Sequence, residues 1–273
     1  MSGEVLESDA DYGRPPFDIF LSERWDNTTS NSWEQWERLV WEWQDLTLME
    51  RWPYQNRAQS ESSPPELSEE IKHVLATHQT AHERNISLVS CDGWQTVWLR
   101  TCYDPDLADK YEKMKWESEV PGWGVAENKV LDDPSRYNFD DGSADCWRRV
   151  LVRVPGITDF RGVIDMYGDE SSIEYLSGQN VESEIALAQE VEEQWRELSL
   201  VELRIQAGLY LLDREAIEYG MVKILWLDEH GQIAWENRCD PYSLQGLTSA
   251  LLSATRLVEL GPNDGARGGV IHR

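Results

Sequence analysis

Two histidines, His78 and His82, have a spacing that suits a metal ion. They are four residues apart in a stretch whose pattern predicts a helix, so both imidazoles would lie on one face. In the HExxH motif a glutamate follows the first histidine, but here Gln79 takes that position. A third ligand would have to come from elsewhere in the chain. The pair is therefore a candidate metal site, with solvated histidines as the favoured alternative.

A second candidate is a group of aspartates in a segment without regular periodicity, residues 117–145. The group consists of Asp132, Asp133, Asp140, Asp141 and Asp145. Neighbouring carboxylates can divide the roles of general acid and general base, or hold a divalent cation. The ligand order and the final glutamate of an EF-hand are missing. We therefore expect Asp140, Asp141 and Asp145 to be catalytic if the protein is an enzyme, and a solvated acidic turn otherwise.

Fourteen tryptophans among 273 residues make up the third unusual feature. A buried indole N–H needs a hydrogen-bond acceptor, so each buried Trp constrains its surroundings. Most of them are expected to pack in the core, whereas exposed ones could bind a flat or cationic ligand. Trp123 and Trp147 flank the aspartate group and are the candidate ligand-binding residues.

Signatures of other chemistry are absent from the sequence. No Ser lies in GxSxG, and neither GxGxxG nor GxxxxGK[ST] occurs, so the sequence indicates no particular cofactor. The four cysteines form no CxxC pair, which argues against a zinc ribbon and against a disulfide framework. A cysteine could still meet a distant histidine in space, so catalysis by a thiol stays open.

The charge of the chain narrows the class of partner. With 51 acidic and 25 basic residues the formal charge is −26, which repels nucleic acids and anionic membranes. A protein or a small ligand that is cationic or aromatic is the expected partner, although the charge could serve solubility alone.

The chain starts without the basic and apolar regions of a signal peptide, and no apolar stretch approaches the length of a bilayer. We expect a cytoplasmic location.

The strongest predicted helix covers Ser30–Trp52. Its apolar stripe recurs at helical spacing and consists of Trp33, Trp36, Leu39, Val40, Trp43 and Leu46. Ser32 and Gln35 fit a capping box, and Pro53 is expected to end the helix. The stripe packs either on the core of its own chain, which we favour, or in the groove of a partner.

The clearest strand signal lies in Gly220–Pro241, which predicts a β-hairpin. Val222, Ile224 and Trp226 alternate with the residues between them, and a polar stretch ending in Gly231 can close the turn. After the turn, Ile233 and Trp235 are expected to share one face.

Further elements are expected on both sides of this hairpin. Helices are predicted over Leu67–Arg84 with Ser68 as its cap, Asp106–Trp116, Val181–Gln206 and Ser243–Leu260. Strands are predicted over Ile86–Val89, Thr96–Arg100, Trp147–Val154 and Leu209–Leu212, while Asp159–Tyr167 fits either a strand or a short helix.

These elements predict an α+β fold, in which an antiparallel or mixed sheet with hairpins packs against amphipathic helices and a Trp-rich N-terminal helix is added. The expected organisation is a flexible acidic arm (1–16), a Trp-rich helical segment (17–55), a linker (56–66), a main α+β domain (67–260) and a disordered tail (261–273).

Two stretches carry a resemblance. In Trp94–Met114 a strand ends in Arg-Thr-x-Tyr before a short helix, and in Leu209–Asp228 a strand ends in Leu-Leu-Asp before a strand containing Val-Lys. Both are similar to uncharacterised proteins of filamentous fungi. The resemblance implies a fungal source and a fold, and no activity.

Two classes of function follow from these observations. The first is a binding or interaction protein for a cationic or aromatic partner. The second is a small accessory enzyme, of fungal specialised metabolism if the resemblance holds, with an aromatic pocket and aspartates as acid, base or metal ligands. Because no catalytic spacing occurs, the binding protein is favoured.

Overall fold

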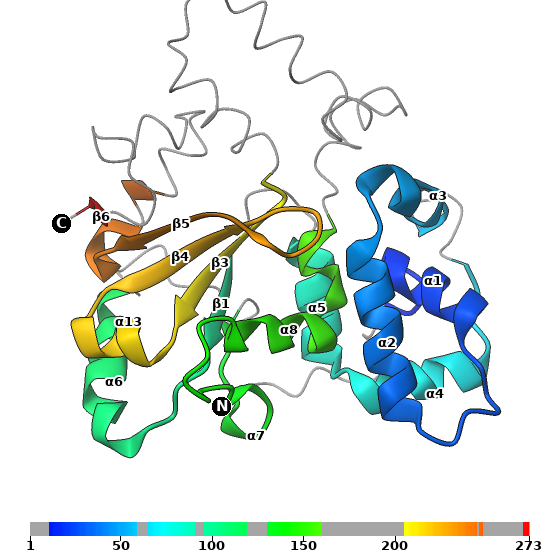
Figure 1. Cartoon of the computed structure of the whole chain (residues 1–273), viewed down its shortest axis with the longest axis horizontal. Coiled ribbons are helices and arrows are strands. Elements are labelled where there is room, and N and C mark those ends of the chain that lie inside the picture. The colour runs from blue at the N-terminus through cyan, green and yellow to red at the C-terminus, as the bar shows by residue number, and fades with distance from the viewer. Residues whose placement is uncertain are drawn as a thin grey trace, which may run out of the picture.

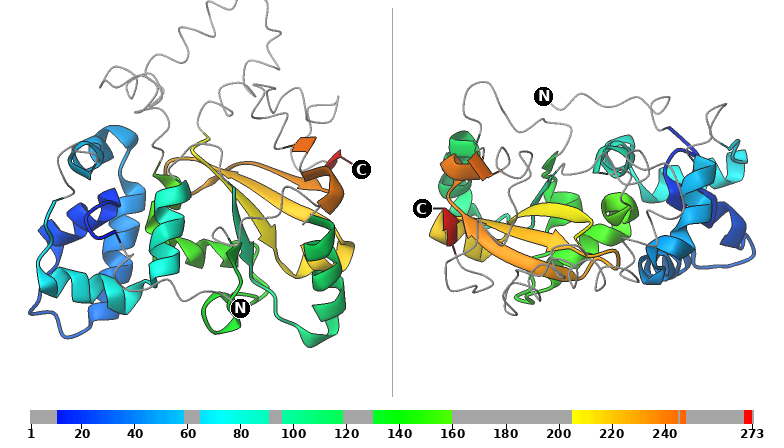
Figure 2. Two further views of the ribbon diagram at one scale, coloured as in Figure 1. Left: turned by 180° about the vertical axis from the view of Figure 1, so that it is seen from behind. Right: turned by 90° about the horizontal axis from the view of Figure 1, so that it is seen from above.

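The computed structural model describes residues 11–58, 65–90, 96–118, 130–159, 205–244, 246–247 and 270–272. In these residues the predicted α+β class is confirmed. A mixed sheet carries helices on its faces, and a layer of further helices stands beside it (Figures 1 and 2).

Six strands of the described residues form one sheet in the order β2-β1-β3-β4-β5-β6. The strands are β1 Val97–Arg100, β2 Val130–Leu131, β3 Ala207–Leu212, β4 Val222–Leu227, β5 Ile233–Cys239 and β6 Val270–His272. β2, β1 and β3 run parallel, whereas β3, β4 and β5 are antiparallel. β6 lies parallel to β5, so three residues of the segment expected to be a disordered tail pair with the sheet.

The helices fall into two groups. The layer beside the sheet consists of α1 Pro16–Arg24, α2 Ser32–Asp45, α3 Leu48–Ala58 and α4 Glu69–His78. Nearer the sheet are α5 Ala81–Ser90, α6 Ala108–Ser118, α7 Pro134–Tyr137, α8 Arg149–Arg153 and α13 Arg214–Tyr219. Short 3₁₀ turns are η2 Pro105–Leu107, η4 Cys146–Arg148, η5 Pro155–Thr158 and η6 Pro241–Ser243.

The two faces of the sheet carry separate cores. Alternation along the strands places Trp98, Tyr210 and Ile224 on one face, where Tyr111 and Met114 of α6 pack against them. The opposite face includes Leu99, Leu209, Leu211 and Leu225, and it is covered by Ile86 of α5 and by Trp147, Val150 and Leu151 around α8. A sheet buried on both faces explains why its central strands are almost wholly apolar.

The predicted hairpin is confirmed as β4 and β5, with one difference. A bulge at Trp226/Leu227 shifts the register, so that Trp226 faces Trp235 while Leu227 faces Ile233. Trp235 therefore packs in the core on one face, and Ile233 packs against the core on the other. The expectation that these two residues share a face was wrong, because a bulge inserts one residue into the alternation.

The predicted helix Ser30–Trp52 is two helices. Asn31, not Ser32, caps α2 by accepting a hydrogen bond from the Glu34 amide. α2 ends at Asp45, and Thr47 starts α3 by exchanging hydrogen bonds with Glu50. Pro53 was expected to end the helix, but it lies inside α3.

Two predicted strands are helical instead. Trp147–Val154 forms η4 and α8, and Ile86–Val89 lies within α5. Val150 of α8 faces the sheet core, while Val152 faces the helical layer. A helix between two cores is apolar on more than one side, and the valine alternation imitated a strand.

Several predictions fall wholly or largely outside the described residues. They are most of the linker 56–66 beyond Ala58, the helices Val181–Gln206 and Ser243–Leu260, and Asp159–Tyr167 after its first residue. Ser68 is confirmed as a cap, because its hydroxyl accepts a hydrogen bond from the Ile71 amide and α4 starts at Glu69.

The Trp-rich helix packs against its own chain. Trp36 and Trp43 are fully buried, and they contact Phe17 and Phe20 of α1. The indole N–H of Trp36 donates to the Val152 carbonyl at 2.8 Å, and that of Trp43 donates to Asp159 Oδ1 at 3.0 Å. Hydrogen bonds therefore fix the helical layer to α8 and η5.

Arg51 of α3 is the most connected buried side chain in this contact. Its guanidinium donates to the carbonyls of Trp43, Gln44 and Glu229, at 3.2, 3.3 and 2.6 Å. It also donates to the Thr158 hydroxyl at 3.1 Å and pairs with Asp159 at 3.2 Å, with both charged side chains almost completely buried. Arg51 thereby joins α2, η5 and the turn between β4 and β5.

We predict that Arg51→Met lowers the free energy of unfolding by about 3–5 kcal/mol, because it leaves the buried Asp159 carboxylate without its cationic partner and removes the donor of four carbonyls. Arg57→Met is the matched control, since Arg57 is half-exposed and pairs with Glu23 at the surface. The control is expected to cost less than about 1 kcal/mol. Urea unfolding measures both, and equal losses would contradict the role given to Arg51.

Candidate functional site

The parallel strands define where ligand-binding residues would gather. Because β2, β1 and β3 run parallel, their carboxyl ends meet at one edge of the sheet, toward which the β3 arrow points in Figure 1. Ligands of open sheets with parallel strands bind at such edges. We call this region the carboxyl edge. It comprises Arg100–Asp106, Asp132–Asp133, Phe139–Asp145 and Asp213–Arg214.

Arg100, the last residue of β1, forms a closed cluster at this edge. Its guanidinium carbon lies 3.6 Å from the ring centre of Tyr111 and 4.4 Å from that of Tyr103. Asp132 pairs with Arg100 at 3.5 Å and accepts the Tyr111 hydroxyl at 2.5 Å. Burial, with Asp132 adding to it, raises the pKa of both tyrosines. These phenols therefore stay neutral and act as packing and hydrogen-bonding groups.

Arg214 ties together two loops of the carboxyl edge. It contacts Asp104 Oδ2 through Nη1 at 2.9 Å and Asp140 Oδ2 through Nε at 3.0 Å. Asp104 follows β1, whereas Asp140 follows α7, so Arg214 after β3 is the ion that connects them. This arginine was not singled out by the sequence analysis, because its partners are 74 and 110 residues away.

The three aspartates predicted as catalytic lie together on one loop. Asp140 is paired with Arg214, and Asp141 pairs with Arg149 and accepts a hydrogen bond from the Ser143 amide. Asp145 is exposed. These surroundings are those of solvated, ion-paired carboxylates rather than of a carboxylate held in a pocket, and the catalytic role stays a prediction.

The tryptophans predicted to bind a ligand are not accessible in the described residues. Trp147 is fully buried in the core between α8 and the sheet. Trp123 lies outside the described residues. Trp33, Trp116, Tyr219 and Tyr242 are instead the large aromatic side chains that the described part of the chain exposes.

The two histidines do not face each other. α4 ends at His78, and Thr80 starts a new helix by exchanging hydrogen bonds with Glu83, so His82 belongs to α5. His82 Nε2 lies 2.8 Å from the Val130 carbonyl oxygen. Within the described ranges, no three His, Cys, Asp or Glu side chains are grouped as metal ligands.

His78 is buried among three tryptophans. Its ring stacks on Trp36 with 4.8 Å between centres and 11° between planes, while Trp33 and Trp25 lie at 5.6 and 6.2 Å. Burial, and then the charge of Arg153, lowers the pKa of His78 from 6.5 to about 4. The neutral imidazole is therefore part of the packing of the helical layer.

This lowered pKa predicts a pH dependence of stability. The folded state favours neutral His78, so its contribution is complete above pH 6.5 and declines as the pH falls toward about 4. Between these limits the unfolding free energy of the wild type should fall by up to about 3 kcal/mol relative to His78→Phe. Urea unfolding across this range measures the difference. His73→Phe, at an exposed position of α4, is the control, and parallel curves for wild type and His78→Phe would refute the assignment.

The described thiols are poorly suited to nucleophilic catalysis. Burial raises the pKa of Cys102 and Cys146, and it raises that of Cys239 to about 12. A nucleophilic cysteine requires the thiolate, which such surroundings suppress at neutral pH.

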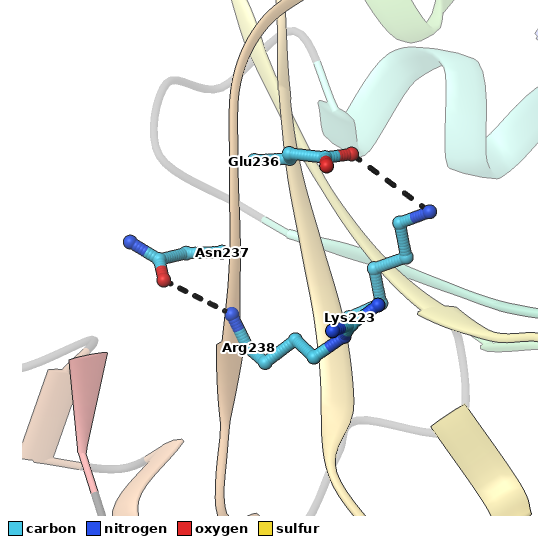
Figure 3. Close-up of a pocket in the computed structure, with 4 residues that line it drawn as sticks. All are labelled: Lys223, Glu236, Asn237 and Arg238. Carbon is cyan, nitrogen blue, oxygen red and sulfur yellow. Dashed lines mark hydrogen bonds and ion pairs between the residues drawn. The ribbon is translucent and has the colours of Figure 1, made fainter. Parts of the chain in front are cut away.

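Beside the carboxyl edge, β4 and β5 form a shallow depression that is open to solvent. It is lined by Lys223, Glu236, Asn237 and Arg238 (Figure 3). The ammonium of Lys223 lies 3.8 Å from Glu236 Oε2 and 4.0 Å from Asp213 Oδ2. Figure 3 shows Lys223 and Glu236 pointing to the same side of the ribbon, with the Asn237 side chain on the other.

Asp213 is the most unusual carboxylate near this depression. It caps α13 by accepting a hydrogen bond from the Ala216 amide at 2.8 Å, yet burial raises its pKa. Sequence reasoning did not select Asp213 or Lys223 as site residues. The sequence nevertheless carried a signal for both residues. Asp213 directly follows a predicted strand, and Lys223 is the charged residue between the apolar residues Val222 and Ile224.

Comparison of the chain with protein-family models, with curated proteins and with solved structures found no match. None of the helices in the described ranges combines the length and the apolar character needed to cross a bilayer.

Proposed function

We propose that this chain is a binding protein whose carboxyl edge holds a cationic partner. The proposal rests on the balance of charges at that edge in the described residues. Both arginines of this edge are paired with carboxylates, Arg100 with Asp132 and Arg214 with Asp104 and Asp140. Two arginines next to the edge, Arg136 and Arg149, pair with its Asp133 and Asp141.

Further carboxylates remain exposed beside these pairs, namely Asp106 and Asp145. A cation approaching the edge therefore meets surplus negative charge and no free arginine of the described residues. The overall charge of −26 adds long-range attraction for the same kind of partner. The raised pKa values of the thiols also favour binding over catalysis by a cysteine. A cytoplasmic location and a fungal source stay predictions made from the sequence.

An oligolysine peptide is a suitable probe, with its affinity followed by calorimetry at low and at physiological ionic strength. Neutralising the exposed carboxylates in Asp106→Asn/Asp141→Asn/Asp145→Asn should weaken binding about fivefold to tenfold, since exposed charges contribute a few tenths of a kcal/mol each. The loss should shrink as salt is added.

The matched control removes the same charge elsewhere, through Glu34→Gln/Glu37→Gln/Glu70→Gln on exposed positions of α2 and α4. This variant should bind the peptide within about twofold of the wild type. Equal losses in both variants would show that total charge, and not the carboxyl edge, attracts the probe.

A small accessory enzyme is the second candidate, and one observation favours it. Asp213 combines a raised pKa with the Lys223 ammonium 4.0 Å away, which is an arrangement that proton transfer can use. The carboxylates Asp140, Asp141 and Asp145 lack such surroundings, so an enzyme would use Asp213 in their place.

A further inference from the structure

Two cations stand opposite each other in the depression beside the carboxyl edge. Lys223 of β4 and Arg238 of β5 are direct cross-strand partners in the hairpin register. Like charges directly opposite each other destabilise an antiparallel pair. In a chain with 51 acidic and only 25 basic residues, such a pair is not explained by composition. A local conflict of this kind often marks a binding site.

Nearby carboxylates neutralise the charges of these two cations to different extents. Arg238 has a close partner, with Nη2 2.7 Å from Glu215 Oε2. Lys223 has none at that distance, because its ammonium lies 3.8 Å from Glu236 and 4.0 Å from Asp213. Both separations exceed a hydrogen bond.

The Lys223 side chain is only 13% exposed, and in the described part of the chain no hydrogen bond uses its ammonium. An ammonium group carries three N–H donors, which need acceptors when the group is largely withdrawn from water. The depression beside Lys223 and Glu236 therefore suits a small molecule that brings its own acceptor.

We propose that this depression binds a small zwitterion with an ammonium and a carboxylate on adjacent carbons, the chemistry of an α-amino acid. The ligand carboxylate would accept from Lys223 and Arg238, and its ammonium would donate to Glu236. A ligand with a single charge would pair with either the cations or the carboxylates of the site, but not with both. A cation meets the repulsion of Lys223 and Arg238, whereas an anion meets that of Glu236, Asp213 and Glu215.

The depression is shallow and open, so the charged head of an amino acid would lie across its mouth and an aliphatic side chain would extend into solvent. Because this site uses charges of both signs, it is distinct from the acidic carboxyl edge. Its failure would leave the proposed function untouched, since the oligolysine test alters none of its residues.

Three matched probes test the proposal: L-norvaline, butylamine, which lacks the carboxylate, and pentanoate, which lacks the ammonium. Ligand-observed NMR titrations of the full chain should show norvaline binding about tenfold more tightly than either probe with a single charge, the effect of losing one charge-assisted hydrogen bond. Equal binding of butylamine would reduce the site to an acidic surface and overturn the proposal. Absence of norvaline binding would overturn it as well.

Two variants locate the binding. Glu236→Gln and Lys223→Met should each weaken norvaline binding about tenfold. Glu236 is 43% exposed at its side chain, so its variant tests the site even where Lys223→Met fails to fold. Lys113→Met and Glu117→Gln, which alter an ion pair on α6, are the controls of equal charge change and should bind as the wild type does. Wild-type affinity in Glu236→Gln would place the ligand elsewhere and refute the assignment.

Discussion

The guanidinium of Arg51 fixes how the helical layer stands against the sheet. Burial lowers the pKa of this arginine, whereas the Asp159 and Glu229 carboxylates act in the opposite direction. An arginine keeps its charge in such a site, so all its donors must be satisfied in place. Apolar contacts would tolerate a shift of the layer, but a planar group with five N–H donors accepts few orientations. The carboxyl edge and the depression on β4 and β5 lie on the sheet that this contact helps to position.

Sequence patterns predicted those elements whose formation depends on residues close together in the chain. The β4–β5 hairpin follows from alternation and a polar turn, and the start of α4 follows from Ser68. The errors arose where tertiary surroundings override local pattern. Val150 and Val152 face two different cores, so apolar residues alternate along the segment as in a strand, although Arg149 and Arg153 lie at helical spacing.

The candidate site was predicted only in part, for a related reason. A crowd of aspartates in residues 132–145 was visible from the sequence, but Arg214, which holds two of the site's carboxylates, is 74 residues from Asp140. The opposition of Lys223 and Arg238 depends on the register of the hairpin, and a bulge shifts that register near the turn. His78 and His82 had the spacing of metal ligands, yet the capping pair Thr80 and Glu83 divides them between two helices.

The choice of acceptors around Arg51 has an evolutionary consequence. Four of its contacts are made with main-chain carbonyls, those of Trp43, Gln44, Thr158 and Glu229, which any amino acid supplies. Substitutions at Glu229 can therefore occur without loss of the bond to its carbonyl, while position 51 itself admits no substitute of equal geometry. The contact therefore constrains the residue type at the donor position more than at an acceptor position. Homologous chains would be expected to vary more at position 229 than at position 51, where arginine is retained.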